Sequence, residues 1–254
     1  MLFKIESACL CKTGKIRENN EDNFYFDGSC LEAENRGLEH PLKMKKLLLR
    51  DLCVAVFDGM GGENYGEFAA FSAAKRMQSV ALKRDSFFDP KEMFLHKLCE
   101  RVNAAVVEEA KELCTARMGS TMAALCFSCG CVYACNLGDS RAYRLRDGEL
   151  LQLSKDHVER WEGQQRKKAP LTQHLGIDPE TFMIEPYITG SRLKHGDQYL
   201  LCSDGLTDML NDLEIREIMC DTPTMEECAQ KLVDAALEKD GRDNVTVIVC
   251  RILK

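Results

Sequence analysis

Short apolar segments dominate the pattern of hydrophobic and polar positions along the chain. Some alternate apolar with polar residues, and others are continuous runs rich in β-branched and aromatic side chains. Both patterns at this length are typical of β-strands. We therefore predict about ten strands, over residues 4–10, 23–28, 52–58, 120–127, 132–138, 141–148, 149–154, 182–189, 198–204 and 244–253.

A helical period appears in longer segments between these strands. Residues 63–82 and 91–114 repeat apolar side chains at the spacing of one helix face, which predicts two amphipathic helices that pack as a pair. The second helix is expected to carry Pro90 at its first helical position. A third helix near the C-terminus is predicted to open at Thr224, which forms a capping-box pattern with Glu227.

The order of these segments predicts an α+β fold. Strands come in runs, with helices grouped between them, so we expect antiparallel sheets that pack together under outer helices. Asp147-Gly148 between two alternating runs is a hairpin signal. No repeat or linker divides the sequence, so residues 1–254 are expected to form one domain, and 45% hydrophobic content is ample for its core.

The charge balance excludes some partners. The chain has 34 Lys and Arg against 41 Asp and Glu, a net charge of -7, so the basic footprint of a nucleic-acid binder is missing. No run approaches the roughly 20 apolar residues of a membrane span. The N-terminus MLFKIESACLCKTG is charged where a signal peptide would be apolar. We expect a cytoplasmic protein with no nucleic-acid and no membrane partner.

The chain has 14 cysteines, many of them inside apolar runs, as Cys53 and Cys250 are. At such positions cysteine acts as a small buried hydrophobe. The group Cys126, Cys129, Cys131 and Cys135 contains a C-x-x-C and leaves a zinc site open as an alternative.

Acidic residues recur where predicted strands begin or end, at Asp58, Asp139, Asp204, Asp243 and within residues 17–22. Strand ends hold side chains at the rim of a sheet, where several can converge on one cleft. Clustered carboxylates stay ionised together when cations compensate them, and Mg²⁺ or Mn²⁺ suits oxygen ligands. Each carboxylate could instead be a cap, a turn residue or a surface ion pair, which is the interpretation we favour for Asp22 and Asp139 taken singly.

Three glycines follow the first of these carboxylates, in VAVFDGMGGENYG at residues 54–66. Without a Cβ, Gly59, Gly61 and Gly62 let a backbone carbonyl and a phosphate approach closely. A dinucleotide-binding loop would need a third glycine where Asn64 stands. The segment therefore favours a metal platform over a nucleotide fold.

Six motifs extend this pattern over almost the whole chain: GKIRENNED (14–22), VFDGMGG (56–62), MGST (118–121), NLGDSRAY (136–143), CSDGLTD (202–208) and GRDNVT (241–246). In content and order they resemble the PPM or type 2C metal-dependent serine/threonine protein phosphatases, in their bacterial form. The resemblance implies a four-layer α-β-β-α sandwich, in which two antiparallel β-sheets pack face to face and are flanked by helices. It also implies a two-metal centre at one end.

The resemblance implies a role for each matched ligand. Asp58 is expected to bridge two Mn²⁺ or Mg²⁺ ions. Asp204 and Asp243 complete the first site, and Glu21 with the carbonyl of Gly59 binds the second. A hydroxide that bridges the ions attacks phosphorus without a covalent enzyme intermediate.

Other matched residues are expected to support this centre. Asp22 lies behind the metal ligands, and Asn244 supports the first site. Asp139 with Asp204 corresponds to a weaker third metal site. Arg17 is expected to clamp the substrate phosphate, with a surface ion pair to Glu21 as the alternative.

The sequence also departs from many relatives. Met60 stands where eukaryotic members have a histidine proposed as general acid, and Met cannot donate a proton. For His157 we favour a local hydrogen-bonded pair with Asp156 over a role as the substitute acid. Residues 156–176 form a shortened flap with a basic run at 166–168, and residues 30–46 are expected to make a surface excursion.

We expect a metal-dependent phosphatase that hydrolyses phosphoserine and phosphothreonine. Its partners would be phosphorylated proteins, namely a serine/threonine kinase and its substrates. The alternative is a catalytically weak phosphatase-like module that binds phosphorylated partners, marked by loss of a metal-binding Asp, and none is lost here. A metal-dependent nuclease would need a basic groove, which the acidic chain does not suggest.

Overall fold

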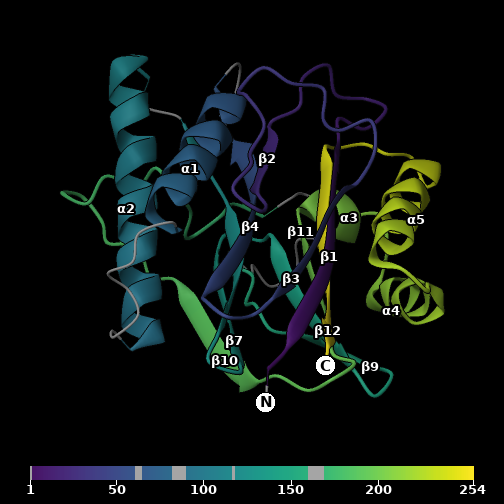
Figure 1. Ribbon diagram of the computed structural model, residues 1–254. Helices are drawn as coiled ribbons and strands as arrows, with labels where there is room; N and C mark the ends of the chain where they lie inside the picture. The colour runs from purple at the N-terminus through teal and green to yellow at the C-terminus, as the bar shows by residue number, and fades with distance from the viewer. Residues whose placement is uncertain (1, 61–64, 82–89, 116–117, 160–168) are drawn as a thin grey trace.

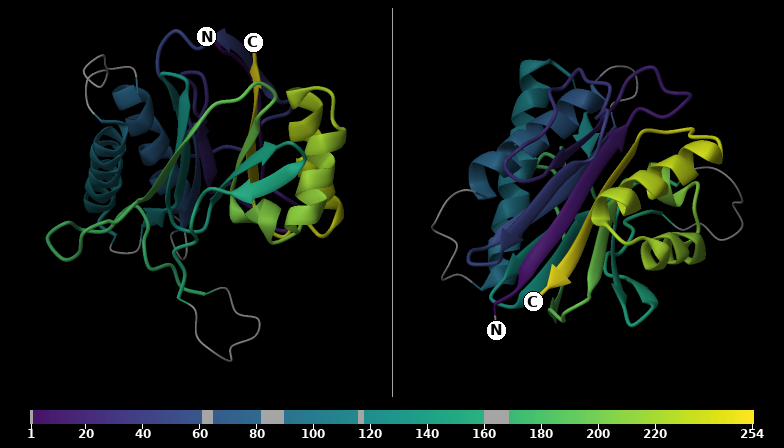
Figure 2. Two further views of the ribbon diagram at one scale, coloured as in Figure 1. Left: turned by 90° about the horizontal axis from the view of Figure 1, so that it is seen from below. Right: turned by 45° about the vertical axis from the view of Figure 1, so that its right-hand side comes forward.

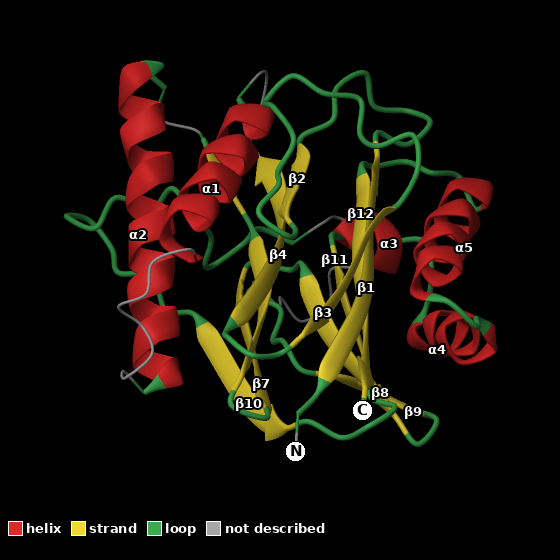
Figure 3. Ribbon diagram, viewed as in Figure 1, coloured by secondary structure: helices red, strands yellow, loops and turns green. Residues whose placement is uncertain are grey.

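The computed structural model describes residues 2–60, 65–81, 90–115, 118–159 and 169–254. Within these residues two antiparallel β-sheets pack face to face, and helices cover both outer faces (Figures 1 and 3). The α+β sandwich expected from the sequence is therefore confirmed.

Each sheet combines strands that are distant in sequence. The first has the order β3 (Leu42–Leu47), β1 (Lys4–Lys12), β12 (Val245–Leu253), β11 (Gln198–Cys202), β8 (Arg141–Arg146) and β9 (Glu149–Gln152). The second has the order β10 (Tyr187–Arg192), β7 (Cys131–Leu137), β6 (Met122–Ser128), β4 (Leu52–Met60) and β2 (Asp22–Tyr25). The short β5 (Gly119–Ser120) pairs with the end of β4. Because β1 pairs with β12 along its whole length, both ends of the chain belong to one sheet.

The helices form the outer layers, as Figure 2 shows from below. On one side α1 (Gly66–Ala81) and α2 (Lys91–Glu112) cover the second sheet. On the other side α4 (Asp212–Asp221) and α5 (Met225–Glu238) cover the first sheet. The short α3 (Asp204–Thr207) follows β11 directly.

Burial on both faces explains the continuous apolar run of β4. Val54 and Val56 point between the two sheets, while Ala55 and Phe57 point toward α1 and α2. Successive side chains of a strand face opposite ways, and a strand covered on both faces needs apolar residues at every position. The polar residue that ends this run therefore stands at the edge of the core.

Local signals account for several boundaries. Asp147 and Gly148 have φ of 52° and 80° and connect β8 to β9, which is the geometry of a two-residue hairpin turn. Thr224 caps α5 by accepting a hydrogen bond from the Glu227 amide at 3.2 Å. Both features were predicted.

Three boundaries differ from prediction. The expected surface excursion ends in β3, an edge strand whose Met44 is buried between the sheets while its lysines are exposed. Charged edge strands of this kind resist further pairing. The strand predicted at 182–189 begins only at Tyr187, after Pro186, which lacks the N–H that a ladder needs. Pro90 is the residue before α2 and not its first helical residue.

All 14 cysteines are free thiols, and Cys53 and Cys250 are buried as expected. In the part of the chain that the structure describes, no helix has the length and apolar character needed to cross a membrane.

Candidate metal centre

One end of the sandwich gathers carboxylates from both sheets. The first residue of β2, Asp22, is the direct strand partner of Asp58 near the end of β4. Lys12 at the end of β1 pairs with Val245 at the start of β12, so the loop after β1 meets Asp243. Residues that are far apart in sequence therefore meet at this end of the sandwich, which we call the rim.

The loop after β1 is held at this rim by Asn244. Its side chain accepts a hydrogen bond from the Glu21 amide at 2.8 Å and donates to the carbonyls of Thr13 at 2.7 Å and Asn19 at 2.9 Å. These bonds satisfy the amide group of Asn244, which is 3% exposed. They fix the backbone that carries Glu21, the ligand expected for the second site, whereas the expectation for Asn244 was support of the first site.

Arg17 lies on the same loop and pairs with Asp243. Its Nη2 donates to Asp243 Oδ2 at 2.9 Å. The surface ion pair with Glu21 that we weighed as an alternative is therefore not the observed one. Because the Arg17 side chain is still 48% exposed, its guanidinium is accessible to an anion.

Asp58 is anchored through its backbone by Thr121. The Asp58 amide donates to Thr121 Oγ1 at 3.1 Å, and the Thr121 amide donates back to the Asp58 carbonyl at 2.8 Å. The Thr121 hydroxyl also pairs with the Ser140 hydroxyl at 2.6 Å. Since Ser140 follows Asp139, this contact brings the loop after β7 to the same rim.

Gly59 is enclosed by backbone. Its amide donates to the Glu21 carbonyl at 3.0 Å. A Cβ at this position would lie 2.0 Å from the carbonyl oxygen of Gly66 and 2.6 Å from that of Glu21. Only glycine fits where β4, α1 and the Glu21 loop converge.

Asp204 reaches the rim through another close approach. It is the first residue of α3 and is 4% exposed. A Cβ on the next residue, Gly205, would lie 1.9 Å from the carbonyl oxygen of Asn244. This glycine therefore lets α3 start directly against the backbone beside Asp243.

Asp22 is buried and bound from the opposite sheet. Its Oδ2 accepts hydrogen bonds of 2.7 Å from both Ser203 and Thr246. Burial raises the pKa of the Asp22 carboxyl to about 7; the two hydroxyls oppose this shift, and the charges of Asp204 and Asp243 add to it. With one oxygen held in this way, Asp22 can support the ligand set from behind.

The other charges of the rim also act on one another. Burial raises the pKa of Glu21, Arg17 opposes this shift, and Glu67 and Asp243 add to it. The hydrogen bond to Asp243 raises the pKa of Arg17, and the charges of Glu21 and Asp58 raise it further. The rim is thus a mutually repelling set of carboxylates, and among the described residues Arg17 is the arginine that acts on them.

The donor set fits hard divalent cations. Carboxylates and a glycine carbonyl are the ligands that Mg²⁺ and Mn²⁺ prefer, and Gly59 and Gly205 bring the backbones that carry them into contact. Among the described residues, however, no three His, Cys, Asp or Glu side chains are already close enough to hold a metal ion. Binding would require side chains such as that of Asp243, now paired with Arg17, to converge.

The cysteines that left zinc open as an alternative are Cys126, Cys129, Cys131 and Cys135. Cys126 and Cys135 are buried, Cys129 is exposed, and Cys135 contacts the thiol of Cys99 at 3.4 Å. Where the chain is described, these cysteines form no group that could hold zinc.

Two further expectations concern residues near the rim. The predicted Asp156–His157 pair is wrong, because Asp156 accepts three hydrogen bonds from Arg141, while His157 Nδ1 accepts one from the Gly138 amide at 3.2 Å. The basic run 166–168 of the expected flap lies outside the described residues.

Sequence reasoning assigned no role to several residues that shape the rim. Ser203 and Thr246 stand inside matched motifs, next to or near expected ligands, so a hydroxyl at these positions was an available signal. Thr121 ends a matched motif in the same way. Glu67 gave no signal, since one acidic residue at the start of a helix is common.

Comparisons with known proteins identify the family to which the sequence and the fold are similar. Residues 43–239 match the sequence model of the protein phosphatase 2C family. Serine/threonine protein phosphatase PstP of Mycobacterium tuberculosis is 32% identical over 254 residues, which cover 94% of this chain and 43% of PstP. Serine/threonine phosphatase stp of Listeria innocua is 29% identical, over 93% of this chain and 91% of stp.

A solved structure gives the same fold. The catalytic domain of PstP in complex with two manganese ions superposes with a TM-score of 0.78 at 28% identity, over 99% of this chain and 100% of that one. The chain spans less than half of the full PstP sequence, 43% of its length. The matched family model and the shared fold show that this chain belongs to the protein phosphatase 2C family.

Proposed function

We propose that the chain hydrolyses phosphoserine and phosphothreonine in proteins and depends on Mn²⁺ or Mg²⁺. The observation that carries the proposal is the rim itself, where Arg17 pairs with Asp243 amid carboxylates from both sheets. Membership in the protein phosphatase 2C family supports it. The PstP catalytic domain, which has the same fold, was solved in complex with two manganese ions, and this supports a two-ion site.

The ligand roles follow the expectations from the sequence. Asp58 would be shared by two ions, with Asp204 and Asp243 on one and Glu21 with the Gly59 carbonyl on the other. When bound, such ions activate water and neutralise charge on phosphoryl oxygens. Burial raises the pKa of Glu21, and the charges of Glu67 and Asp243 add to this shift, so a cation beside these carboxylates would be stabilising.

Two further residues complete the proposed set. Asp139 with Asp204 would hold a weaker third ion, and the Ser140–Thr121 contact places the Asp139 loop at the rim. Asp22 would support the centre from behind, since its Oδ2 is already held by hydroxyls of the opposite sheet.

Arg17 would bind the substrate phosphate. A guanidinium offers a planar set of donors that matches phosphate oxygens, and the raised pKa of Arg17 keeps it charged. In the structure the group is held by Asp243. An arriving phosphate dianion would compete for the same donors, while Asp243 turned toward the rim.

Proton delivery to the leaving oxygen does not involve residue 60. Met60 has no proton to give. The serine or threonine oxygen would therefore take its proton from water or from another residue.

The wider setting stays a prediction. Strand pairing between β1 and β12 supports one catalytic domain over residues 1–254. A cytoplasmic location and a partner serine/threonine kinase, with its substrates, are expected from the sequence.

Phosphate release from a phosphothreonine peptide and from p-nitrophenyl phosphate tests the proposal. We expect turnover with Mn²⁺, loss of turnover with EDTA, and a fall in kcat/KM of at least about 100-fold in Asp58→Asn. Asp221→Asn is the matched control, because it removes the same charge from an exposed position on α4. Isothermal titration with Mn²⁺ should show binding to the control and much weaker binding to Asp58→Asn.

Turnover that survives EDTA would contradict the metal dependence. Tight binding of the phosphopeptide without hydrolysis would favour the alternative of a phosphatase-like binding module.

A further inference from the structure

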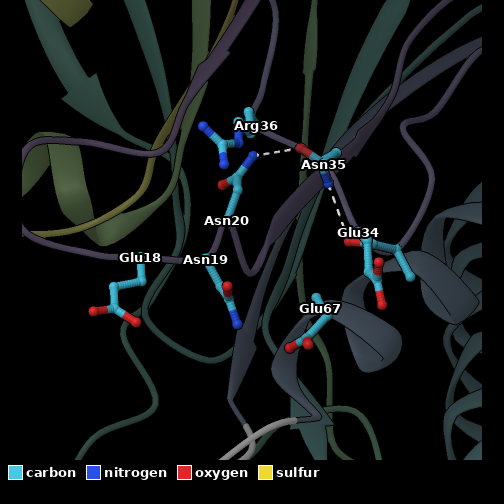
Figure 4. Close-up of a pocket in the computed structure, with 8 residues that line it drawn as sticks. Glu18, Asn19, Asn20, Glu34, Asn35, Arg36 and Glu67 are labelled. Atoms are coloured by element: carbon cyan, nitrogen blue, oxygen red, sulfur yellow. Dashed lines mark hydrogen bonds between the residues drawn. The ribbon is translucent and has the colours of Figure 1, made fainter.

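A polar cavity of about 300 Å³ opens beside the rim (Figure 4). Three consecutive residues after Arg17 form one wall, the loop before β3 forms another, and the first turn of α1 closes the end. The lining residues are Glu18, Asn19, Asn20, Ala33, Glu34, Asn35, Arg36 and Glu67. A volume at the low end of the range for ligand pockets suits a single side chain.

The walls of this cavity are fastened together. Asn20 Nδ2 donates to Asn35 Oδ1 at 2.7 Å, which ties the loop after β1 to the loop before β3. Asn35 also donates to the carbonyl of Glu32 at 2.9 Å and accepts from the Gly37 amide at 2.9 Å. The cavity is therefore a built feature and not a gap between independent loops.

Glu67 is the group that points to a ligand. Its side chain lines the cavity and is 9% exposed, and its Oε2 has no hydrogen-bond partner among the described residues. A buried carboxylate without a partner is costly. Its charge acts on Glu21, whose side chain packs against Gly66. Among the described residues, no cation pairs with Glu67 at this end of the cavity.

Carboxylates outnumber cations in the described lining of the cavity. Glu18 and Glu34 line it together with Glu67 and form no ion pair within the described parts of the chain, and Arg36 is the one cation among these described lining residues. Figure 4 draws Arg36 at the opposite end from Glu67, while Asn19 extends in the same direction as Glu67. A cation at the Glu67 end would meet the unpartnered carboxylate oxygen of Glu67.

We propose that this cavity binds a basic side chain, Lys or Arg, of the phosphorylated protein substrate. The inference rests on the proposed function, because Arg17 marks where the phosphate binds. Residues 17 and 20 can be at most about 11 Å apart. An extended peptide advances about 3.3 Å per residue. About three residues of extended peptide span this backbone distance, so we expect the basic residue to lie close in sequence to the phosphorylated one.

A metal ion in this cavity is the less favoured occupant. The described residues contain no group of three His, Cys, Asp or Glu side chains that could hold one here. A long flexible ammonium or guanidinium group needs only one buried carboxylate and neighbouring acceptors.

Binding of hydrolysis-resistant phosphonate peptides tests the proposal. In a neutral nine-residue peptide with a central phosphothreonine mimic, one Lys is placed in turn at each flanking position and compared with norleucine. Fluorescence anisotropy in Mn²⁺ gives the affinities. We expect Lys to bind about tenfold more tightly than norleucine at one or two adjacent positions.

Three variants make the test specific. Glu67→Gln should reduce the Lys-to-norleucine ratio to within twofold. Glu34→Lys, at an exposed position on the cavity wall, should also reduce the Lys-to-norleucine ratio. Because this position is exposed, the result does not depend on whether Glu67→Gln folds correctly. Glu100→Gln removes the same charge from an exposed position on α2 and should keep the ratio.

The outcomes separate the two proposals. A ratio near one at every position in the wild type, no binding of any Lys peptide, or a preference that survives both cavity variants would overturn the cavity assignment. So would a Glu67→Gln variant that keeps the preference but loses Mn²⁺ affinity in titration, because Glu67 would then serve the metal site. Failure to hydrolyse any phosphothreonine peptide, with the Lys preference intact, would contradict only the proposed catalysis.

Discussion

At the scale of single residues, one hydroxyl group, that of Thr121, anchors the backbone of Asp58. Thr121 Oγ1 accepts the Asp58 N–H at 3.1 Å and contacts Ser140 at 2.6 Å. Thr121→Val keeps the shape but leaves the buried N–H without this acceptor. We expect a loss of about 1–3 kcal/mol in the free energy of unfolding, together with weaker Mn²⁺ binding, measured by urea denaturation and by titration.

Ser128 provides the control for this change. It is buried, and its Oγ has no hydrogen-bond partner among the described residues. Ser128→Ala should therefore be neutral or slightly stabilising, because an unpaired buried hydroxyl costs free energy. Equal effects of the two substitutions would contradict the role given to Thr121.

Asp197 gives a pH-dependent prediction away from the rim. Burial acts to raise its pKa, but hydrogen bonds from Arg146 at 2.6 and 2.7 Å, from the Lys194 amide and from Tyr199 outweigh burial and lower the pKa. An acid with a lowered folded pKa contributes stability above its unfolded pKa of about 3.9 and loses it as pH falls through the folded value.

The comparison is between wild type and Asp197→Asn. Breaking a buried ion pair costs about 3–5 kcal/mol, so the two proteins should differ by that amount at neutral pH. The difference should shrink below about pH 4 as the wild-type carboxyl takes up its proton. Urea denaturation across this range measures it, and a difference that does not change with pH would count against the ion pair.

Residue-level prediction from sequence found the charges but not all of their partners. The hydroxyls that bind Asp22 lie 181 and 224 positions away in sequence, and only the packing of the two sheets brings them together. The pairing of Arg17 with Asp243 in place of Glu21 has the same cause, because the two residues are 226 positions apart.

At the scale of elements, the start of α3 is set by Gly205. A Cβ there would lie 1.9 Å from the carbonyl oxygen of Asn244, so Gly205→Ala must push α3 away from the segment before β12. We expect a loss of about 3 kcal/mol or more in the free energy of unfolding. Mn²⁺ affinity should also fall, because Asp204 moves relative to Asp243.

Gly28→Ala separates this contact from a general effect of losing a glycine. Gly28 has a φ of 81°, but nothing lies within 4 Å of its ideal Cβ. Its substitution should therefore cost only the backbone strain of about 1–2 kcal/mol and leave Mn²⁺ binding unchanged. If Gly205→Ala behaved in the same way, the close approach would not be what places Asp204.

Elements with a regular repeat of apolar residues were predicted well from the sequence. Elements that form because of their neighbours in the fold were not. The paired helices and the β8–β9 hairpin follow from local pattern. The sequence of β3 resembles a polar loop. Its lysines are compatible with a strand only at the edge of a sheet, and pairing with β1 is what places this segment at the edge. The capping box that opens α4 at Asn211 and Glu214 was present in the sequence and was not used.

At the scale of the whole molecule, the packing of the two sheets brings four acidic strand ends that are distant in sequence to one rim. They are the ends that carry Asp58, Asp139, Asp204 and Asp243. Sequence reasoning could expect convergence, because polar residues that end buried strands collect at sheet edges. It could not give the close approach of α1 and α3 to the rim, which depends on Gly59 and Gly205. Nor could it place Glu67 beside Glu21, since no local pattern links the two.

The central claim is that this rim binds two divalent ions that share Asp58. A crystal soaked in Mn²⁺ and measured by anomalous scattering tests it most directly. We expect two peaks about 3.5–4 Å apart, with Asp58 between them, Glu21 on one and Asp204 with Asp243 on the other. The absence of any anomalous peak among these carboxylates at millimolar Mn²⁺ would contradict the account.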